Sequence, residues 1–219
     1  MLKYPQPGMV KTRLSNTLGA ECAADLYRFF VACELRTVQR LQVPILLSCH
    51  PHRSLAAYRA WLGEEYSYAS QGEGDLGVKM RTSFQRAFDL GLSRVVLIGS
   101  DIPQLPAASL YSALTHLHDH DAVIGPAQDG GYYLLGLKGK SFHSGLFTGI
   151  AWSTPHVMAQ TQEKLHNYDL NPFILPSIRD IDTLEDLKHL LTSQGWPVDP
   201  PQALEDSLHS LLQSFWQRE

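Results

Sequence analysis

The sequence predicts an α/β fold in which helices flank a mostly parallel central sheet. Segments with helical periodicity alternate along the chain with short apolar runs. One run, residues 95–98, is apolar without a break, which is typical of a strand buried on both faces of a sheet. The 219 residues suit one domain with a sizeable core, and they show no internal repeat. In such sheets the ligand binds beyond the carboxyl ends of the strands, so functional residues are sought there.

The apolar pattern places the individual elements. Helices are expected at residues 20–41, 76–91, 106–118, 154–167 and 183–191. Strands are expected at residues 45–47, 95–98, 122–124, 132–137 and 173–175. Gly91 suits a helix C-cap, and Pro106 suits a first helical turn. Asp182 suits an N-cap, with Glu185 three residues later as in a capping box.

Composition and charge narrow the functional classes. Hydrophobic residues make up 44% and charged residues 18% of the chain, which is a globular composition rather than a disordered one. The net charge of −4 disfavours nucleic acid or an anionic membrane as a partner, so a phosphate site must be a local cationic cluster. No apolar run approaches the roughly 20 residues that span a bilayer. The N-terminus also lacks the apolar region of a signal peptide.

The cysteines indicate the redox environment. Cys22 and Cys33 fall in a predicted helix and Cys49 near a predicted strand, without the spacing of a metal site. We expect three reduced thiols and a cytoplasmic location.

The first candidate site is the loop at residues 3–14, whose sequence is KYPQPGMVKTRL. Lys3, Lys11 and Arg13 concentrate positive charge in an otherwise acidic chain, and Thr12 and the backbone add hydrogen-bond donors. A diphosphate needs this combination of cations and donors on a stiff backbone. The alternative is a solvated basic loop near a terminus.

Two acidic segments could hold a divalent metal. Asp101 follows the run at residues 95–98, so it lies at the carboxyl end of a predicted strand, where a carboxylate can hold Mg²⁺ or Mn²⁺ against phosphate oxygens. In the segment Asp180-Ile181-Asp182-Thr183, Asp182 could supply a second ligand. The alternatives are a turn role for Asp101 and helix capping for Asp182.

Two glycine-rich segments are ambiguous. Residues 125–132 contain Asp129-Gly130-Gly131, which suits either a plain hairpin turn or a loop that a ligand approaches closely. Residues 72–77 match G-x-G-x-x-G, but Glu73 and Asp75 would put negative charge where a pyrophosphate should lie. We therefore interpret Asp75 as a helix N-cap or as a hydrogen-bond acceptor for a base or ribose.

Five segments, in order, resemble a known family. KYPQPGMVKTRL, GDLGVKM, VVLIGSDIPQL, IGPAQDGGYYLLGL and DIDTLEDL cover residues 3–191. Together they are similar to the rSAM/selenodomain-associated transferase 1 family, which belongs to the nucleotide-diphospho-sugar transferase (GT-A) superfamily. The resemblance implies a GT-A domain at residues 1–195, and residues 196–219 lie beyond it.

The resemblance also implies roles for individual residues. Gly8, Lys11 and Arg13 would contact the nucleotide and its phosphates. Asp101 corresponds to the superfamily's metal-binding aspartate, and Asp182 to a later acidic ligand of related nucleotidyltransferases. Asp129 would face the acceptor, and we expect it to act as the acceptor-side base.

The sequence departs from the family pattern at two points. The usual Asp-x-Asp becomes Ile98-Gly99-Ser100-Asp101, with one acidic residue, so the metal site depends on Asp182 to complete it. Family members open with a buried apolar strand, whereas here only Met1 and Leu2 precede Lys3. We expect the reading frame to continue upstream with apolar residues, or else a shortened member of the family.

The sequence-based hypothesis is a metal-dependent glycosyltransferase that uses a nucleotide-diphospho-sugar donor and an unknown small-molecule acceptor. Mg²⁺ or Mn²⁺, with Lys11 and Arg13, would neutralise the departing diphosphate. The alternatives are a nucleotidyltransferase that releases pyrophosphate and a non-catalytic nucleotide-binding protein. Residues 196–219 are expected to form a helical extension that packs on the domain or on a partner subunit, as in a homodimer.

Overall fold

The computed structural model describes residues 1–192, and the predicted α/β fold is confirmed. The helices are α1 (Thr12–Leu18), α2 (Ala20–Gln39), α3 (Leu55–Leu62), α4 (Leu76–Asp89), α5 (Ala107–His116), α6 (Val157–Asn167) and α7 (Leu184–Thr192). The strands are β1 (Leu46–Cys49), β2 (Ser67–Ser70), β3 (Arg94–Ile98), β4 (Ala122–Pro126), β5 (Tyr132–Lys138) and β6 (Pro172–Ile174). Two short 3₁₀ helices, η1 (Gly139–Ser141) and η2 (Ser144–Phe147), follow β5. The proposed extension at residues 196–219 lies outside the described residues.

The strands form two separate sheets. The larger has the order β3-β5-β4-β6, in which β5 runs antiparallel to β3 and β4, while β4 and β6 are parallel. The smaller is a parallel pair of β1 and β2. Leu2 extends this pair by a single parallel bridge to Cys49.

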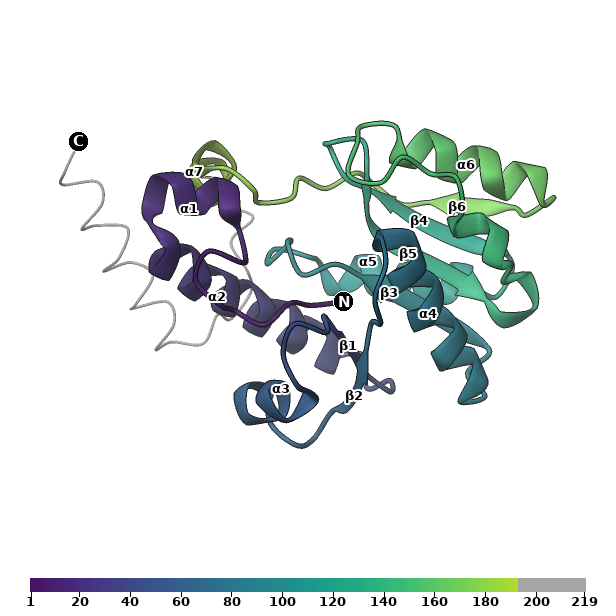
Figure 1. Cartoon of the computed structure of the whole chain (residues 1–219). Coiled ribbons are helices and arrows are strands. Elements are labelled where there is room, and N and C mark those ends of the chain that lie inside the picture. The colour runs from purple at the N-terminus through teal and green to yellow at the C-terminus, as the bar shows by residue number, and fades with distance from the viewer. Residues whose placement is uncertain (193–219) are drawn as a thin grey trace.

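Helices cover both faces of the larger sheet. Successive side chains of a strand point to opposite faces, so the apolar residues of each strand need cover on both. On one face Ile124 and Leu135 pack with α4, α6 and η2. On the other face Val123 and Leu134 pack with α5. Helix α2 packs against α7, and these helices gather with α1 at the opposite end of the molecule from β6 (Figure 1). The N-terminal residues run between these two parts of the molecule (Figure 1).

The structure corrects two local predictions. Asp182 does not cap α7: Thr183 Oγ1 accepts a hydrogen bond from the Asp186 N–H, and the Asp186 carboxylate accepts from the Thr183 N–H. This reciprocal pair leaves the Asp182 side chain available for other contacts. The strand at residues 95–98 is also not buried on both faces, because its side chains are only half-buried. A cavity beside β3 accounts for this difference.

Cys22 and Cys33 lie on α2 and Cys49 on β1, and all three are free thiols, as expected. None of the helices within residues 1–192 is long and apolar enough to cross a membrane.

Candidate functional site

The Lys11 side chain is the centre of the candidate site. Its backbone has φ +46°, a left-handed conformation that is uncommon for a residue other than glycine. The side chain is only 3% exposed. Its Nζ atom lies 2.5 Å from Asp101 Oδ1 and 3.1 Å from Asp182 Oδ1, and it donates to the Ile181 carbonyl at 2.8 Å. A strained backbone therefore holds one ammonium between two carboxylates.

The charge of Lys11 is set by two opposing effects. Burial by itself lowers the pKa of the ammonium, because the charged form loses hydration. The Asp101 and Asp182 carboxylates outweigh that effect and raise the pKa of Lys11 above its ordinary value. Lys11 is therefore a fixed positive charge at neutral pH.

Helix α2 positions the loop that carries Asp101. Tyr27 shares a 2.7 Å hydrogen bond with Ser100, and its hydroxyl also accepts from the Lys3 N–H at 2.9 Å. Glu34 lies further along the same helix, and its Oε1 atom accepts a hydrogen bond from the Ile102 N–H at 2.8 Å. These side chains tie the N-terminal loop and the Asp101 loop to one rigid helix.

Glu34 is a buried carboxyl with an unusual environment. Burial raises its pKa to about 8, the hydrogen bond from Ile102 N–H opposes that shift, and the nearby Asp101 adds to it. Tyr27 and Glu34 are site residues that the sequence does not indicate. Both lie in the predicted helix at residues 20–41, and their partners Ser100 and Ile102 are more than 60 residues away.

Arg13 and Asp182 complete the charged cluster. Arg13 lies 3.4 Å from Asp182 Oδ2 and is 72% exposed, so its guanidinium is accessible to a ligand. The structure therefore brings together four of the residues singled out in the sequence: Lys11, Arg13, Asp101 and Asp182.

A cavity of about 210 Å³ lies on the acidic side of this cluster. Its walls include Asp101, Asp129, Asp180 and Asp182. Asp129 Oδ1 accepts a 2.8 Å hydrogen bond from the Gly131 N–H, so this carboxylate stabilises its own turn. Gly130 in this turn packs closely against Pro155, because a Cβ at Gly130 would lie 2.3 Å from the Pro155 carbonyl oxygen.

Asp180 is a second carboxyl of this cavity with a raised pKa, besides Glu34, which also lines it. Burial raises the pKa of Asp180 to about 6, and the nearby Asp129 and Asp182 carboxylates add to the shift. The sequence showed Asp180 only as the partner of Asp182 in an alternating acidic segment. Its burial depends on packing that no local pattern reveals.

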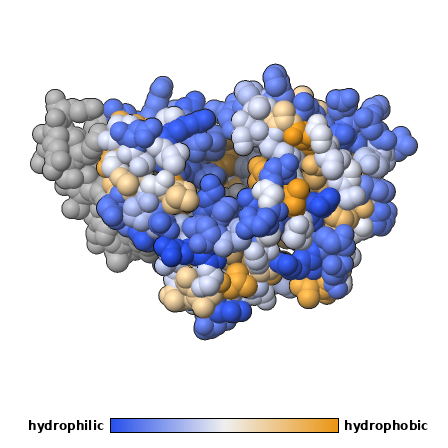
Figure 2. Space-filling view, in the orientation of Figure 1, coloured by the Kyte–Doolittle hydropathy of each residue, from blue (hydrophilic) through white to orange (hydrophobic). Residues whose placement is uncertain are grey.

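A second cavity, of about 220 Å³, lies on the basic side of the cluster. Lys3, Lys11, Gln71, Asp101 and Tyr132 are among the residues that line it. Asp101 and Tyr132 also line the acidic cavity, so the two cavities adjoin. The space-filling view shows a hollow between the α1–α7 region and the larger sheet (Figure 2).

The remaining predicted residues have mainly local roles. Gly8 has φ +77° in the turn that precedes α1, and Thr12 is the first residue of that helix. Asp75 is the N-cap of α4 and accepts from the Val78 N–H at 2.8 Å, which confirms the capping interpretation. A Cβ at Gly77 would lie 2.4 Å from the Trp152 ring, so packing accounts for that glycine of the G-x-G-x-x-G pattern.

The carboxylates do not form a complete metal centre by themselves. Within residues 1–192, no group of three or more His, Cys, Asp or Glu residues is placed to hold a metal ion. Asp101 and Asp182 nevertheless converge on one cation, the Lys11 ammonium. Two carboxylates suit an ion such as Mg²⁺, which takes its other ligands from water and substrate phosphates.

Comparisons with known proteins show the family to which the chain is similar. The family described as "Uncharacterized protein conserved in bacteria (DUF2064)" matches residues 34–154. A crystal structure from Desulfovibrio desulfuricans G20, named "putative nucleotide-diphospho-sugar transferase", is 39% identical, with a TM-score of 0.88 over 98% of this chain and 95% of that chain. No curated protein matches the sequence.

More distant structures share the fold alone. The manganese complex of Rv0371C from Mycobacterium tuberculosis H37Rv is 17% identical, with a TM-score of 0.52 over 75% of this chain and 86% of that one. The 4-diphosphocytidyl-2C-methyl-D-erythritol synthase of Anaerococcus prevotii DSM 20548 is 11% identical, with a TM-score of 0.56 over 85% of this chain and 93% of that one. These comparisons support the predicted fold, while the narrower rSAM-associated family stays a prediction.

Proposed function

The chain belongs to the DUF2064 family, and we propose that it is a metal-dependent glycosyltransferase with a nucleotide-diphospho-sugar donor. The observation that carries the proposal is the Lys11 ammonium held between Asp101 and Asp182, with Arg13 exposed beside it. A nucleotide diphosphate needs cations for its phosphates and carboxylates for its metal, and this cluster supplies both.

Asp101 and Asp182 are the residues that would hold Mg²⁺ or Mn²⁺. The bound ion would neutralise charge on the diphosphate leaving group. The manganese complex of the Mycobacterium tuberculosis protein with the same fold supports the choice of a divalent ion. Lys11 now fills the space between the carboxylates, so ligand binding would move its ammonium from these carboxylates to a phosphate oxygen.

The two cavities suggest where the parts of the substrate lie. The basic cavity, with Lys3 and Gln71 on its wall, would take the nucleotide end. The acidic cavity would take the sugar and its acceptor. There Asp180, with a pKa of about 6, would accept a proton from an acceptor hydroxyl near neutral pH, and Asp129, the base expected from the sequence, lies on the same wall.

The metal dependence predicts the behaviour of Asp101→Asn. We expect nucleoside diphosphate binding by the parent chain to be at least about tenfold tighter with Mn²⁺ than with chelator. The variant should lose most of this difference and stay folded, because asparagine has nearly the same volume. Isothermal titration calorimetry with a panel of nucleoside diphosphates measures both affinities. Asp119→Asn, at an exposed turn, is the matched control. Equal affinity with and without Mn²⁺ in the parent chain would refute the metal role.

The phosphate role of the basic loop predicts the behaviour of Arg13→Ala. The variant should lose binding free energy for a nucleoside diphosphate. Because Arg13 is 72% exposed, we expect a loss at the lower end of the range for a charge-assisted hydrogen bond, about 1.5 kcal/mol, or roughly tenfold in affinity. The corresponding nucleoside without phosphates should bind the parent chain and the variant with equal affinity. An equal loss for nucleoside and diphosphate would instead assign a structural role to this loop.

The reaction itself is tested by its products. A glycosyltransferase releases nucleoside diphosphate from a nucleotide sugar and an acceptor. Pyrophosphate release from nucleoside triphosphate would instead support a nucleotidyltransferase. Metal-dependent binding without turnover across a broad acceptor panel would favour a non-catalytic nucleotide-binding protein.

A further inference from the structure

A group of basic side chains lies where the end of β1 meets α4, and it shares no residue with the Lys11 cluster. His50, His52 and Arg53 follow β1, and Lys79 lies on α4. His50 Nδ1 lies 2.9 Å from His52 Nδ1, and Lys79 Nζ lies 3.3 Å from His50 Nε2. We call these four residues the histidine cluster.

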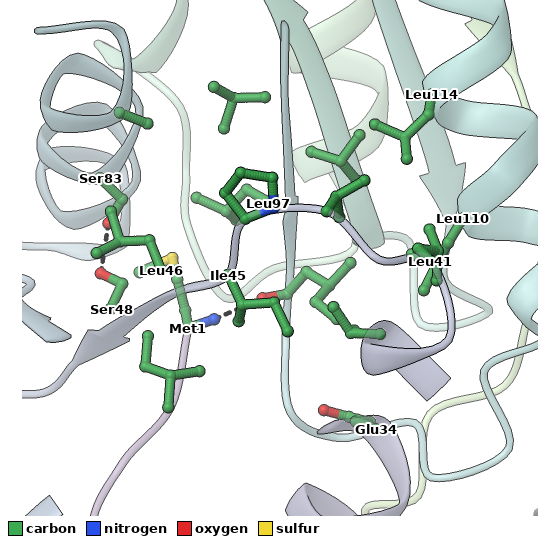
Figure 3. A pocket seen from close by; sticks show the side chains of 18 of the residues that line it. Met1, Glu34, Leu41, Ile45, Leu46, Ser48, Ser83, Leu97, Leu110 and Leu114 are labelled. Atoms are coloured by element: carbon green, nitrogen blue, oxygen red, sulfur yellow. Dashed lines mark hydrogen bonds between the residues drawn. The ribbon is translucent and has the colours of Figure 1, made fainter. Parts of the chain in front are cut away.

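The packing of β1 on α4 brings His50 and Lys79 together. Ser48 on β1 and Ser83 on α4 share a 2.6 Å hydrogen bond at the wall of a cavity of about 520 Å³ (Figure 3). His50 comes two residues after Ser48 and therefore points to the same side. Lys79 comes four residues before Ser83, so it lies one turn away on the same face of the helix. The Tyr58 hydroxyl, from α3, donates to the His50 carbonyl at 3.0 Å and holds this segment in place.

The cations of this region lack carboxylate partners. Within the part of the chain that the structure describes, Lys3, Arg53 and Lys79 form no ion pair with an aspartate or glutamate. The other cations with printed ion pairs each have such a partner: Lys11, Arg13, Arg28, Arg59 and Arg179. In a chain of net charge −4, a local group of unpaired cations attracts an anion.

The surrounding charges keep both imidazole rings neutral. Burial, followed by the Lys79 ammonium, lowers the pKa of His50, and His52 and Lys3 add to this effect while Glu73 opposes it. Burial and the Arg53 guanidinium lower the pKa of His52. At pH 7 each ring therefore carries one N–H donor and one acceptor nitrogen.

The hydrogen bonds of His50 direct a donor at a donor. The Nδ1 atom of His50 accepts from the His52 backbone N–H at 3.3 Å, which assigns the ring proton to Nε2. The Nε2–H group then faces the Lys79 ammonium, which has donors only. An oxyanion resolves this conflict, because one oxygen can accept from Nε2–H while another accepts from the ammonium.

We propose that the histidine cluster binds a phosphate group, with the His50 Nε2–H and the Lys79 ammonium as donors and Arg53 as an added positive charge. The phosphate belongs either to the nucleotide or to a separate small molecule. Lys3 connects the two possibilities, because its charge reaches both imidazoles and its side chain also lines the basic cavity. The proposal is independent of the proposed transferase chemistry, since it uses neither the Lys11 loop nor the aspartates.

The test follows the ring signal of His50 by NMR while the full chain is titrated with inorganic phosphate, and His50→Gln identifies that signal. We expect a saturable shift at millimolar phosphate, whereas chloride at the same ionic strength should leave the signal unchanged. Lys79→Met should weaken phosphate binding by about tenfold or more, because a charge-assisted hydrogen bond is lost. Arg53→Gln should cause a smaller loss, and Lys140→Met, at an exposed position in η1, is the matched control.

The pH dependence uses sulfate, which stays doubly charged from about pH 6 to pH 8 and so does not add its own titration. Sulfate affinity should increase as the pH falls, because a protonated His50 adds positive charge beside Lys79 and Lys3. By the same coupling, saturating sulfate should raise the pKa of His50 by about one pH unit.

A saturating nucleoside diphosphate or triphosphate distinguishes the two sources of the phosphate. If the nucleotide carries it, the nucleotide itself should shift the His50 signal and block the response to inorganic phosphate. If a separate molecule carries it, that response should persist with nucleotide bound. A His50 signal that does not respond to phosphate, or responds equally to chloride, would overturn the proposal. Unchanged phosphate affinity in both Lys79→Met and Arg53→Gln would also overturn it.

Discussion

Replacing Lys11 with methionine is expected to shift metal affinity and nucleotide affinity in opposite directions. The ammonium lies against Asp101 and Asp182 and competes with a divalent cation for the same carboxylates. Its removal should tighten Mn²⁺ binding in the absence of nucleotide by about tenfold or more, because two like-charged ions no longer compete. Nucleoside diphosphate binding should weaken by about 2–3 kcal/mol, or roughly 30- to 150-fold, because a charge-assisted phosphate contact is lost.

Calorimetric titration with Mn²⁺ alone, and then with nucleoside diphosphate at saturating Mn²⁺, measures the two effects separately. Methionine keeps the length of the buried stem, and the carboxylates of Asp101 and Asp182 retain solvent contact, so the fold should persist. Lys164→Met, on α6, is the matched control. A parallel loss of both affinities would show that Lys11 organises the loop rather than exchanging with the metal.

Glu34 is expected to control both stability and its dependence on pH. Glu34→Ala removes the acceptor of the buried Ile102 N–H and leaves a cavity, which should cost about 2–4 kcal/mol of unfolding free energy. Glu34→Gln keeps an acceptor oxygen and should cost much less at neutral pH.

The pH dependence follows from the direction of the pKa shift. The pKa of Glu34 rises from an ordinary 4.5 to about 8, so between these values the folded chain keeps a proton that the unfolded chain has lost. Its contribution to stability is therefore complete below pH 4.5 and decreases as pH rises towards 8, by up to about 1.4 kcal/mol per pH unit. Glutamine does not titrate, so the stability of Glu34→Gln relative to the parent chain should increase as the pH rises from 4.5 to about 8.

Chemical denaturation of the parent chain and both variants at several pH values measures this difference. Glu21→Gln, at the exposed start of the same helix, is the matched control. A constant difference between the parent chain and Glu34→Gln from pH 5 to 8 would contradict the assigned titration.

Sequence patterns predicted the elements that depend on local periodicity. Helices α2 and α4 begin at the predicted residues, and the strand at residues 122–124 lies within β4, because one face or run of apolar side chains defines each. Helix α3 and the short strand β2 were not assigned, since eight and four residues carry too little periodicity. The antiparallel direction of β5 also depends on tertiary pairing that local patterns do not specify.

The candidate site was predictable as a set of charged residues but not as a geometry. Lys11, Asp101 and Asp182 were each identified from their own segments, yet their direct contact spans 171 positions in the chain. The sequence predicts that Lys11 binds phosphates and that Asp101 and Asp182 bind a metal ion. The ion pairs between Lys11 and these carboxylates connect the two predicted roles. The acidity of Asp180 and the buried position of Glu34 could not be predicted, because both depend on packing against distant segments.

The left-handed backbone of Lys11 has a consequence for attempts to make this protein more stable. A glycine would adopt φ +46° without the steric cost that a lysine side chain imposes. Glycine would also remove the buried ion pairs with Asp101 and Asp182, and their loss costs more than the relief of the backbone strain. A library screened only for heat resistance would therefore retain Lys11, although its backbone conformation alone favours glycine.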